Sequence, residues 1–252
     1  MSSEKVALIT GSGRPRVGHV VAESLAQAGF RLALHYHRSQ KAAQASRSRF
    51  LDRGIDAEAF QADVALEADV ERMFDRLLQR FGRIDVLVTT ASIWSPKPLE
   101  QLTADDVRRN FNVNTLGTFL CARRAGLLMV DQPEGGAIVT LGDWAIARPY
   151  PDHAAYLISK GAIPTLTRTL AVELAARNPN VRVNCILPGP VMFPESMDAG
   201  QRQVAVESTL LKRADFPESI AHAVRFLVEN EFVTGVVIPV DGGRTIFAAG
   251  EA

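Results

Sequence analysis

The fold is decided by two adjoining stretches, VALIT at residues 6–10 and GSGRPRVG at residues 11–18. A short apolar run that ends in a glycine-rich turn and opens into a helical pattern is typical of a strand–turn–helix unit that binds a dinucleotide. Glycines let such a turn bend tightly and bring backbone N–H groups against a pyrophosphate at the helix N-terminus. A purely structural strand–helix turn has the same composition, so the turn alone leaves both interpretations open.

Short apolar runs alternate with helical patterns along the rest of the chain, and the runs are rich in Val, Ile and Leu, as in parallel strands buried on both faces. Seven strands joined by helices favour a doubly wound sheet over a TIM barrel, which needs eight βα units. We predict one α/β Rossmann domain over residues 1–252, with helices on both faces of a seven-stranded parallel sheet. The expected strands are Val6–Thr10, Arg31–Tyr36, Ala57–Gln61, Val86–Thr89, Ala137–Leu141, Val181–Leu187 and Val236–Pro239, and the expected helices are Gly18–Ala28, Gln40–Asp52, Glu67–Phe81, Thr103–Met129, Ala154–Ala176 and Pro217–Val228.

The composition narrows the classes of function. The 252 residues contain 28 Lys+Arg and 28 Asp+Glu, so the basic excess of a nucleic-acid-binding protein is absent. No apolar run approaches the ~18 residues of a membrane span, and no signal-peptide pattern precedes the first strand. Cys121 and Cys185 lack metal-ligand spacing. We expect a cytoplasmic protein that binds no metal, nucleic acid or membrane.

The end of the second predicted strand distinguishes between dinucleotide cofactors. An NAD site places an Asp or Glu about 20 residues beyond the glycine-rich turn, where it binds the ribose 2′-hydroxyl. Here the strand ends in HYHRS at residues 35–39, without an acid. Arg38, Ser39 and Arg16 instead offer two guanidinium groups and a hydroxyl to a 2′-phosphate, although Arg38 could equally solvate a surface turn. The sequence therefore predicts NADPH as the cofactor.

Tyr156 and Lys160 stand four residues apart, which places them on one face of the expected helix Ala154–Ala176. An ammonium group beside a phenol favours the phenolate and is expected to lower a pKa that starts near 10. A tyrosine with a lowered pKa can act as a general acid near neutral pH.

These features together resemble the short-chain dehydrogenase/reductases over essentially the whole chain. The shared motifs are Thr10-Gly11…Gly18, Asp63-Val64, Asn112-Val113-Asn114, Tyr156…Lys160, Pro188-Gly189 and Asp241-Gly242-Gly243. The resemblance implies that Tyr156 donates a proton, Lys160 holds the nicotinamide ribose, and Asn114 supports a proton-relay water. It implies cofactor binding by Gly11, Arg16, Val17, Gly18, His37, Arg38, Ser39, Asp63, Val64, Ala91, Ser92, Lys160, Pro188 and Gly189.

The chain departs from the usual family pattern at several positions. The turn is one residue longer with Arg16 in place of a glycine, residues 89–92 read TTAS rather than NNAG, and Asp143 occupies the serine position thirteen residues before Tyr156. These departures resemble the pteridine reductase branch, including dihydromonapterin reductases. That branch implies a pterin bound by Ser92, Trp94, Asp143 and Tyr156, with Trp94 stacking on the ring; a packing role for Trp94 stays open.

The aspartate bears on the reaction. An ionised carboxylate cannot donate to a developing alkoxide, whereas a carboxyl group can accept from ring N–H donors or pass a proton through Tyr156 when a C=N bond is reduced. Asp143 as a plain turn former is the alternative. We expect an NADPH-dependent reductase of a dihydropterin-like ring C=N; a carbonyl reductase, for instance of 3-oxoacyl thioesters, is the rival, and a non-catalytic NADPH sensor is more remote.

Two expectations concern assembly and substrate access. The expected helices Thr103–Met129 and Ala154–Ala176 are apolar on more than one face. The family pairs such helices across one dimer axis and adds a second axis through the C-terminal strand, so the resemblance implies a homotetramer. Residues 191–212, which contain no family motif, are expected to cover the substrate.

Overall fold

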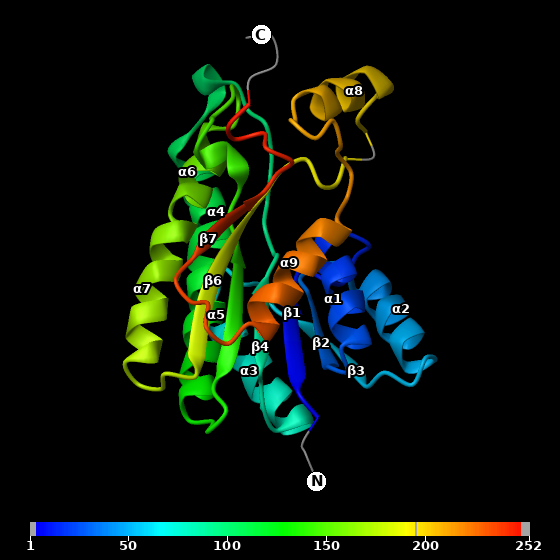
Figure 1. Cartoon of the computed structure of the whole chain (residues 1–252), viewed down its shortest axis with the longest axis vertical. Coiled ribbons are helices and arrows are strands. Elements are labelled where there is room, and N and C mark those ends of the chain that lie inside the picture. The colour runs from blue at the N-terminus through cyan, green and yellow to red at the C-terminus, as the bar shows by residue number, and fades with distance from the viewer. Residues whose placement is uncertain (1–3, 195, 248–252) are drawn as a thin grey trace.

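A computed structural model describes residues 4–194 and 196–247 and shows one sheet with helices on both faces (Figure 1). The strand order is β3-β2-β1-β4-β5-β6-β7, and every neighbouring pair is parallel. The predicted seven-stranded, doubly wound fold is confirmed. The strands are β1 (Val6–Thr10), β2 (Arg31–Tyr36), β3 (Ala57–Gln61), β4 (Val86–Thr89), β5 (Gly136–Leu141), β6 (Val181–Pro188) and β7 (Val237–Val240).

Alternate residues of each central strand enter one of two apolar cores, because successive side chains point to opposite faces. In β1, Leu8 joins the core beneath α3, α5 and α7, and Ile9 joins the core beneath α1, α2 and α9. Both side chains are fully buried, which explains the continuous apolar pattern of the strand. The covering helices are α1 (Val17–Gln27), α2 (Gln40–Leu51), α3 (Glu67–Phe81), α5 (Gly117–Val130), α7 (Ile163–Ala175) and α9 (Glu218–Glu229).

Each of the two longest predicted helices is divided in the structure. The first comprises α4 (Ala104–Asn110), a π-helical turn η2 (Phe111–Leu116) and α5. Such π turns are rare and often occur at functional sites. The second divides into α6 (Ala154–Gly161) and α7, where Pro164 in the first turn of α7 lacks the N–H that a continuous helix needs.

One helix was absent from the prediction. α8 (Ala199–Glu207) lies within the segment 191–212 and outside the two helical layers (Figure 1). It begins with a capping box between Asp198 and Gln201, a sequence signal that could have revealed it. No helix in the described ranges is long and apolar enough to cross a bilayer.

The parallel strands bring the predicted site residues to one edge of the sheet. Gly11 follows β1, Ala91 follows β4, Asp143 follows β5, and Gly189 follows β6. The strand order reverses between β1 and β4, and ligands of open α/β sheets bind beyond the carboxyl ends at such a point.

Candidate active site

The glycine-rich turn is held against the second strand by a buried histidine. Gly11 has a positive φ of 73°, and its N–H donates to Nδ1 of His35 over 2.9 Å. The other ring nitrogen of His35 lies 3.1 Å from the carbonyl of Ala62, and burial lowers the His35 pKa to about 4. The imidazole is therefore neutral at pH 7, with Nδ1 as acceptor and Nε2 as donor. The sequence analysis did not identify this positioning role.

The departure from the family pattern at Thr90 has a structural explanation. Its hydroxyl donates to the carbonyl of Thr10, and the N–H of Ala91 donates to Oγ1 of Thr10 over 3.1 Å. A Cβ at Gly18 would overlap the Thr90 hydroxyl, so Gly18 allows α1 to approach the end of β4. Thr90 thus joins the two strands that flank the reversal point.

The surface beside this turn has the charge that the predicted cofactor requires. Arg14, Arg16 and Arg38 are exposed, and within the described part of the chain none has a side-chain hydrogen bond or ion pair. Gly13 N–H donates to the carbonyl of His35, which places the turn against the end of β2. Free guanidinium groups fit a dinucleotide phosphate. Arg14 is an addition to the residues expected from the sequence.

The other expected cofactor residues lie around the same edge. Ser39 begins α2, and Nε2 of His37 lies 3.6 Å from a carboxylate oxygen of Asp63. The other oxygen of Asp63 accepts from the N–H of Ala65 over 3.0 Å. Val17 lies in the first turn of α1, and Val64 packs against Gly117. Pro188 and Gly189 lie at the end of β6, where the Gly189 N–H donates to the carbonyl of Val240.

Asn114 lies in the π turn, and its side-chain amide makes four hydrogen bonds, all of them to other groups of the protein. Oδ1 accepts from the Ile93 N–H over 2.8 Å and from the Ser92 hydroxyl over 3.0 Å. Nδ2 donates to the Ile93 carbonyl over 3.0 Å and to Ser159 Oγ over 2.9 Å. Asn114 therefore fixes the loop after β4 against α6, and any water relay must use its backbone carbonyl, which accepts from Thr118.

Asp143 and Tyr156 form the central pair of the site. Asp143 begins a short 3₁₀ turn, η3 (Trp144–Ile146), and its Oδ1 accepts from the N–H of Ala145 over 2.8 Å. Its Oδ2 accepts from the hydroxyl of Tyr156 over 2.6 Å. The first bond fixes the carboxylate, so the carboxylate in turn fixes the direction of the phenolic O–H.

This pair reverses the expected effect on the tyrosine. Burial and the adjacent Asp143 carboxylate raise the pKa of Tyr156 well above its usual value of 10.0, whereas the sequence analysis expected Lys160 to lower it. The Lys160 ammonium instead donates to the Leu141 carbonyl over 2.8 Å and lies 6.0 Å from the centre of the tyrosine ring. Burial, the larger cause, and the closer negative charge together outweigh the lysine, so the phenol remains protonated.

Trp94 lies in an aromatic group beside the pair. Its side chain is 46% exposed, and its indole stacks on His153 with 4.9 Å between ring centres. The indole N–H points to the hydroxyl of Tyr150 over 3.5 Å. The structure therefore gives Trp94 a packing partner while leaving part of its surface accessible.

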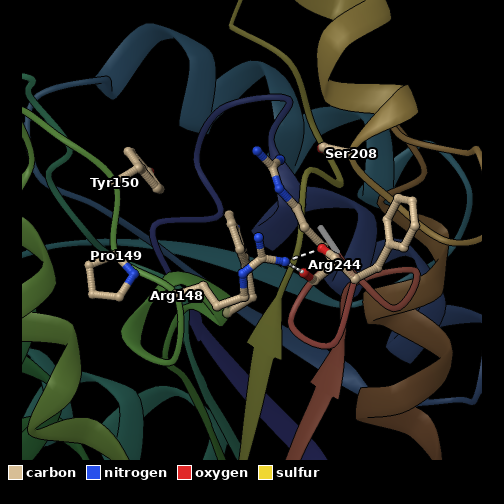
Figure 2. A pocket seen from close by; sticks show the side chains of 7 residues that line it. Arg148, Pro149, Tyr150, Ser208 and Arg244 are labelled. Atoms are coloured by element: carbon tan, nitrogen blue, oxygen red, sulfur yellow. Dashed lines mark hydrogen bonds between the residues drawn. The ribbon is translucent and has the colours of Figure 1, made fainter. Parts of the chain in front are cut away.

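A cavity of about 230 Å³ lies beside Trp144, the residue that follows Asp143; the residues that line it are drawn in Figure 2. Trp144, which follows Asp143, lines the cavity and belongs with Tyr156 to one apolar cluster against which Tyr150 packs. The sequence analysis missed most of this wall, because its residues come from the loop before α6, the end of α8 and the segment after β7. The lining residues are Trp144, Arg148, Pro149, Tyr150, Ser208, Arg244 and Phe247.

We expect the ionisation of Tyr156 to occur well above pH 10.0 in an ultraviolet difference titration, and to be absent in Tyr156→Phe. Asp143→Asn should move the transition downward, because the repelling carboxylate is removed while burial remains. Since the folded pKa exceeds the unfolded one, the unfolded state loses its proton first as pH rises. The free energy of unfolding should therefore fall above about pH 10 more steeply in the wild type than in Tyr156→Phe. A transition at or below the usual pKa would contradict this assignment.

Known proteins resemble the chain over almost its full length. A family model described as enoyl-(acyl carrier protein) reductase matches residues 16–245. A short-chain dehydrogenase/reductase from Pestalotiopsis microspora, GME11373, is 34% identical over 256 residues, covering 95% of this chain and 94% of that protein. A 3-oxoacyl-[acyl-carrier-protein] reductase from Synechocystis is 32% identical over 248 residues, covering 96% and 98%.

Solved structures agree with these relatives. A crystal structure of NAD⁺-bound xylitol dehydrogenase superimposes with a TM-score of 0.86 at 30% identity, covering 96% of this chain and 100% of that one. None of the three proteins named here is described as a pteridine reductase, so the finer branch is not shown. With the fold, the Tyr156–Lys160 pair and matches that span the whole domain, the chain is an oxidoreductase that belongs to the short-chain dehydrogenase/reductase family.

Proposed function

We propose that this protein is an NADPH-dependent reductase of a small carbonyl compound, with Tyr156 as the proton donor. The observation that carries the proposal is the 2.6 Å hydrogen bond from Tyr156 to Asp143 in a buried setting. This contact fixes the direction of the phenolic O–H, and the phenol carries the proton that a reduction consumes. The name of the Synechocystis relative supports a carbonyl acceptor.

The choice of NADPH rests on the arginines around the glycine-rich turn. NADPH, when bound, supplies the hydride. Arg16 and Arg38 would hold its 2′-phosphate, Asp63 and Val64 would bind its adenine, and Lys160 would bind the nicotinamide ribose. No acidic residue lies at the end of β2 to compete for that ribose. The backbone of the turn receives the pyrophosphate at the start of α1.

The hydrogen-bonded pair of Asp143 and Tyr156 determines how proton transfer is timed relative to hydride transfer when a carbonyl is reduced. Negative charge develops on the oxygen as hydride arrives, and an ionised Asp143 nearby would destabilise it. Tyr156 removes that charge when it transfers its proton to the oxygen. Proton transfer must therefore keep pace with hydride transfer, and Lys160 lies close enough to stabilise the resulting phenolate.

A second candidate, reduction of a ring C=N bond in a dihydropterin, is favoured by Asp143 itself. One lone pair on each carboxylate oxygen is used by Ala145 or Tyr156, which leaves others free to accept from the amino and ring N–H groups of a pterin. The exposed face of Trp94 offers a surface for stacking, and Ser92 adjoins it. A serine hydroxyl at this position would be neutral and would have two lone pairs for such donors, whereas the two oxygens of a carboxylate have about four.

Residues 191–212, which include α8, cover the substrate in the cavity. Ser208, at the C-terminal end of α8, lines the cavity, which supports a substrate-covering role for residues 191–212. We assign residues 1–252 to a single domain. We also assign the protein to the cytoplasm.

Replacing Arg38 by Ala should weaken NADPH binding about 10- to 150-fold and leave NADH binding nearly unchanged, because a charged hydrogen bond to phosphate contributes about 1.5–3 kcal/mol. Fluorescence titration with both cofactors measures the effect. Arg49→Ala is the control, since it removes an exposed arginine from α2, the helix that begins two residues after Arg38. Equal losses for both cofactors in Arg38→Ala would show a structural role only.

Substitution of Asp143 decides between the two acceptors when NADPH oxidation is measured with 3-oxoacyl thioesters, small ketones and dihydropterins. For a carbonyl acceptor, Asp143→Ser should maintain or raise turnover, because a hydroxyl donates to the developing oxyanion. For a pterin, Asp143→Asn should lower turnover by about 10²–10⁴.

Asp152→Asn serves as the control, because it neutralises an exposed acid in the same loop. NADPH binding without oxidation by any acceptor would contradict both reductase assignments and leave the non-catalytic NADPH sensor.

The assembly proposed here is a homotetramer. Ile158 on α6 and Val172 on α7 are 59% and 72% exposed, an apolar face suited to a second copy. Wild-type protein should sediment as a tetramer at micromolar concentration, and Val172→Glu should dissociate it by placing a charge at the interface. Leu66→Glu adds a charge at another exposed apolar position and should leave the tetramer intact. A wild-type monomer would exclude the proposal.

A further inference from the structure

Arg244 presents an unused cationic group to the cavity beside the catalytic pair. It follows the turn Asp241-Gly242-Gly243, and its guanidinium carbon lies 4.2 Å from the centre of the Trp144 ring. Among the described residues, its side chain has this ring contact but no hydrogen bond and no ion pair. Five N–H donors are therefore free at the cavity wall.

The second arginine of the cavity has a different, structural role. Nη1 of Arg148 donates to the carbonyl of Arg244 over 2.8 Å and also to the carbonyl of Phe247 (Figure 2). These bonds tie the loop before α6 to the segment after β7. Arg148 thereby holds the backbone that carries Arg244, while Arg244 keeps its own side chain available.

The acids nearest to Arg244 are already engaged with other groups. Asp143 accepts from Ala145 and Tyr156. Asp241 accepts from the Gly243 N–H over 2.9 Å and from both the N–H and the hydroxyl of Thr245, over 2.7 Å and 2.6 Å. Partial burial lowers the pKa of Arg244, yet a guanidinium stays charged in proteins. A partly desolvated cation without a direct counter-ion is costly, and a bound anion would remove that cost.

We infer that the substrate is a small organic acid whose carboxylate binds Arg244 while its reducible bond faces Tyr156. This inference rests on the proposed reductase function and adds the substrate class. The cavity of about 230 Å³ is small, and Trp144 and Tyr150 give it an aromatic wall for the carbon skeleton. Trp144 contacts the Arg244 guanidinium, follows Asp143 in sequence and belongs with Tyr156 to one apolar cluster, so it connects the Arg244 side of the cavity to the proton donor.

Calorimetric binding of benzoate and of its neutral isostere benzamide, both at saturating NADP⁺, tests the charge requirement. Wild-type protein should bind benzoate about 10- to 150-fold more tightly than benzamide, the range for a hydrogen bond to a charged group. Arg244→Gln should abolish that preference without changing benzamide binding, and Arg244→Lys should retain most of it.

The matched control is Arg76→Gln, because Arg76 on α3 also lies over an aromatic ring, that of Phe60, but far along the chain from the cavity. It should bind both compounds like the wild type. Equal affinities for benzoate and benzamide in the wild type, or an unchanged preference in Arg244→Gln, would overturn the inference. Failure of the proposed function is seen separately, as NADPH that is not oxidised with any acceptor.

Discussion

The pairing of β1 with β4 is the constraint on which the site depends. Thr10 lies opposite Thr89 in the parallel register, so both strands end at the same level. Thr10 then receives hydrogen bonds from the Thr90 hydroxyl and the Ala91 N–H. The chain leaves the sheet in opposite directions from this point, because the strand order reverses here. The glycine-rich turn and the loop that contains Trp94 consequently border the same crevice.

At the other side of that crevice, two opposite charges, those of Asp143 and Lys160, act on the hydroxyl of Tyr156. Asp143 contacts the Tyr156 hydroxyl directly, whereas Lys160 is directed to a backbone carbonyl. Burial is the larger cause of the raised Tyr156 pKa, and the carboxylate acts in the same direction. A serine at this position would remove the negative charge beside the phenol, while burial would still raise the Tyr156 pKa.

Among the described residues, two groups of arginines near the crevice have no side-chain hydrogen bond or ion pair. Arg14, Arg16 and Arg38 surround the turn after β1 and suit the phosphates of a dinucleotide. Arg244 lies at the cavity beyond β5, next to the aromatic wall and the proton donor. A guanidinium gains most from an anion where water is excluded, so the partly buried Arg244 has the greater need of a specific partner.

The sequence by itself determined the sheet, its strand boundaries within about two residues, and the family, because apolar periodicity and motif order are local properties. It also placed Tyr156, Lys160 and Asp143 in one site. The predicted direction of the Tyr156 pKa shift was wrong, because the shift depends first on burial and then on which charge lies nearer in space. The wall around Arg244 was missed, because its residues come from segments that are distant in the chain and meet only through tertiary packing.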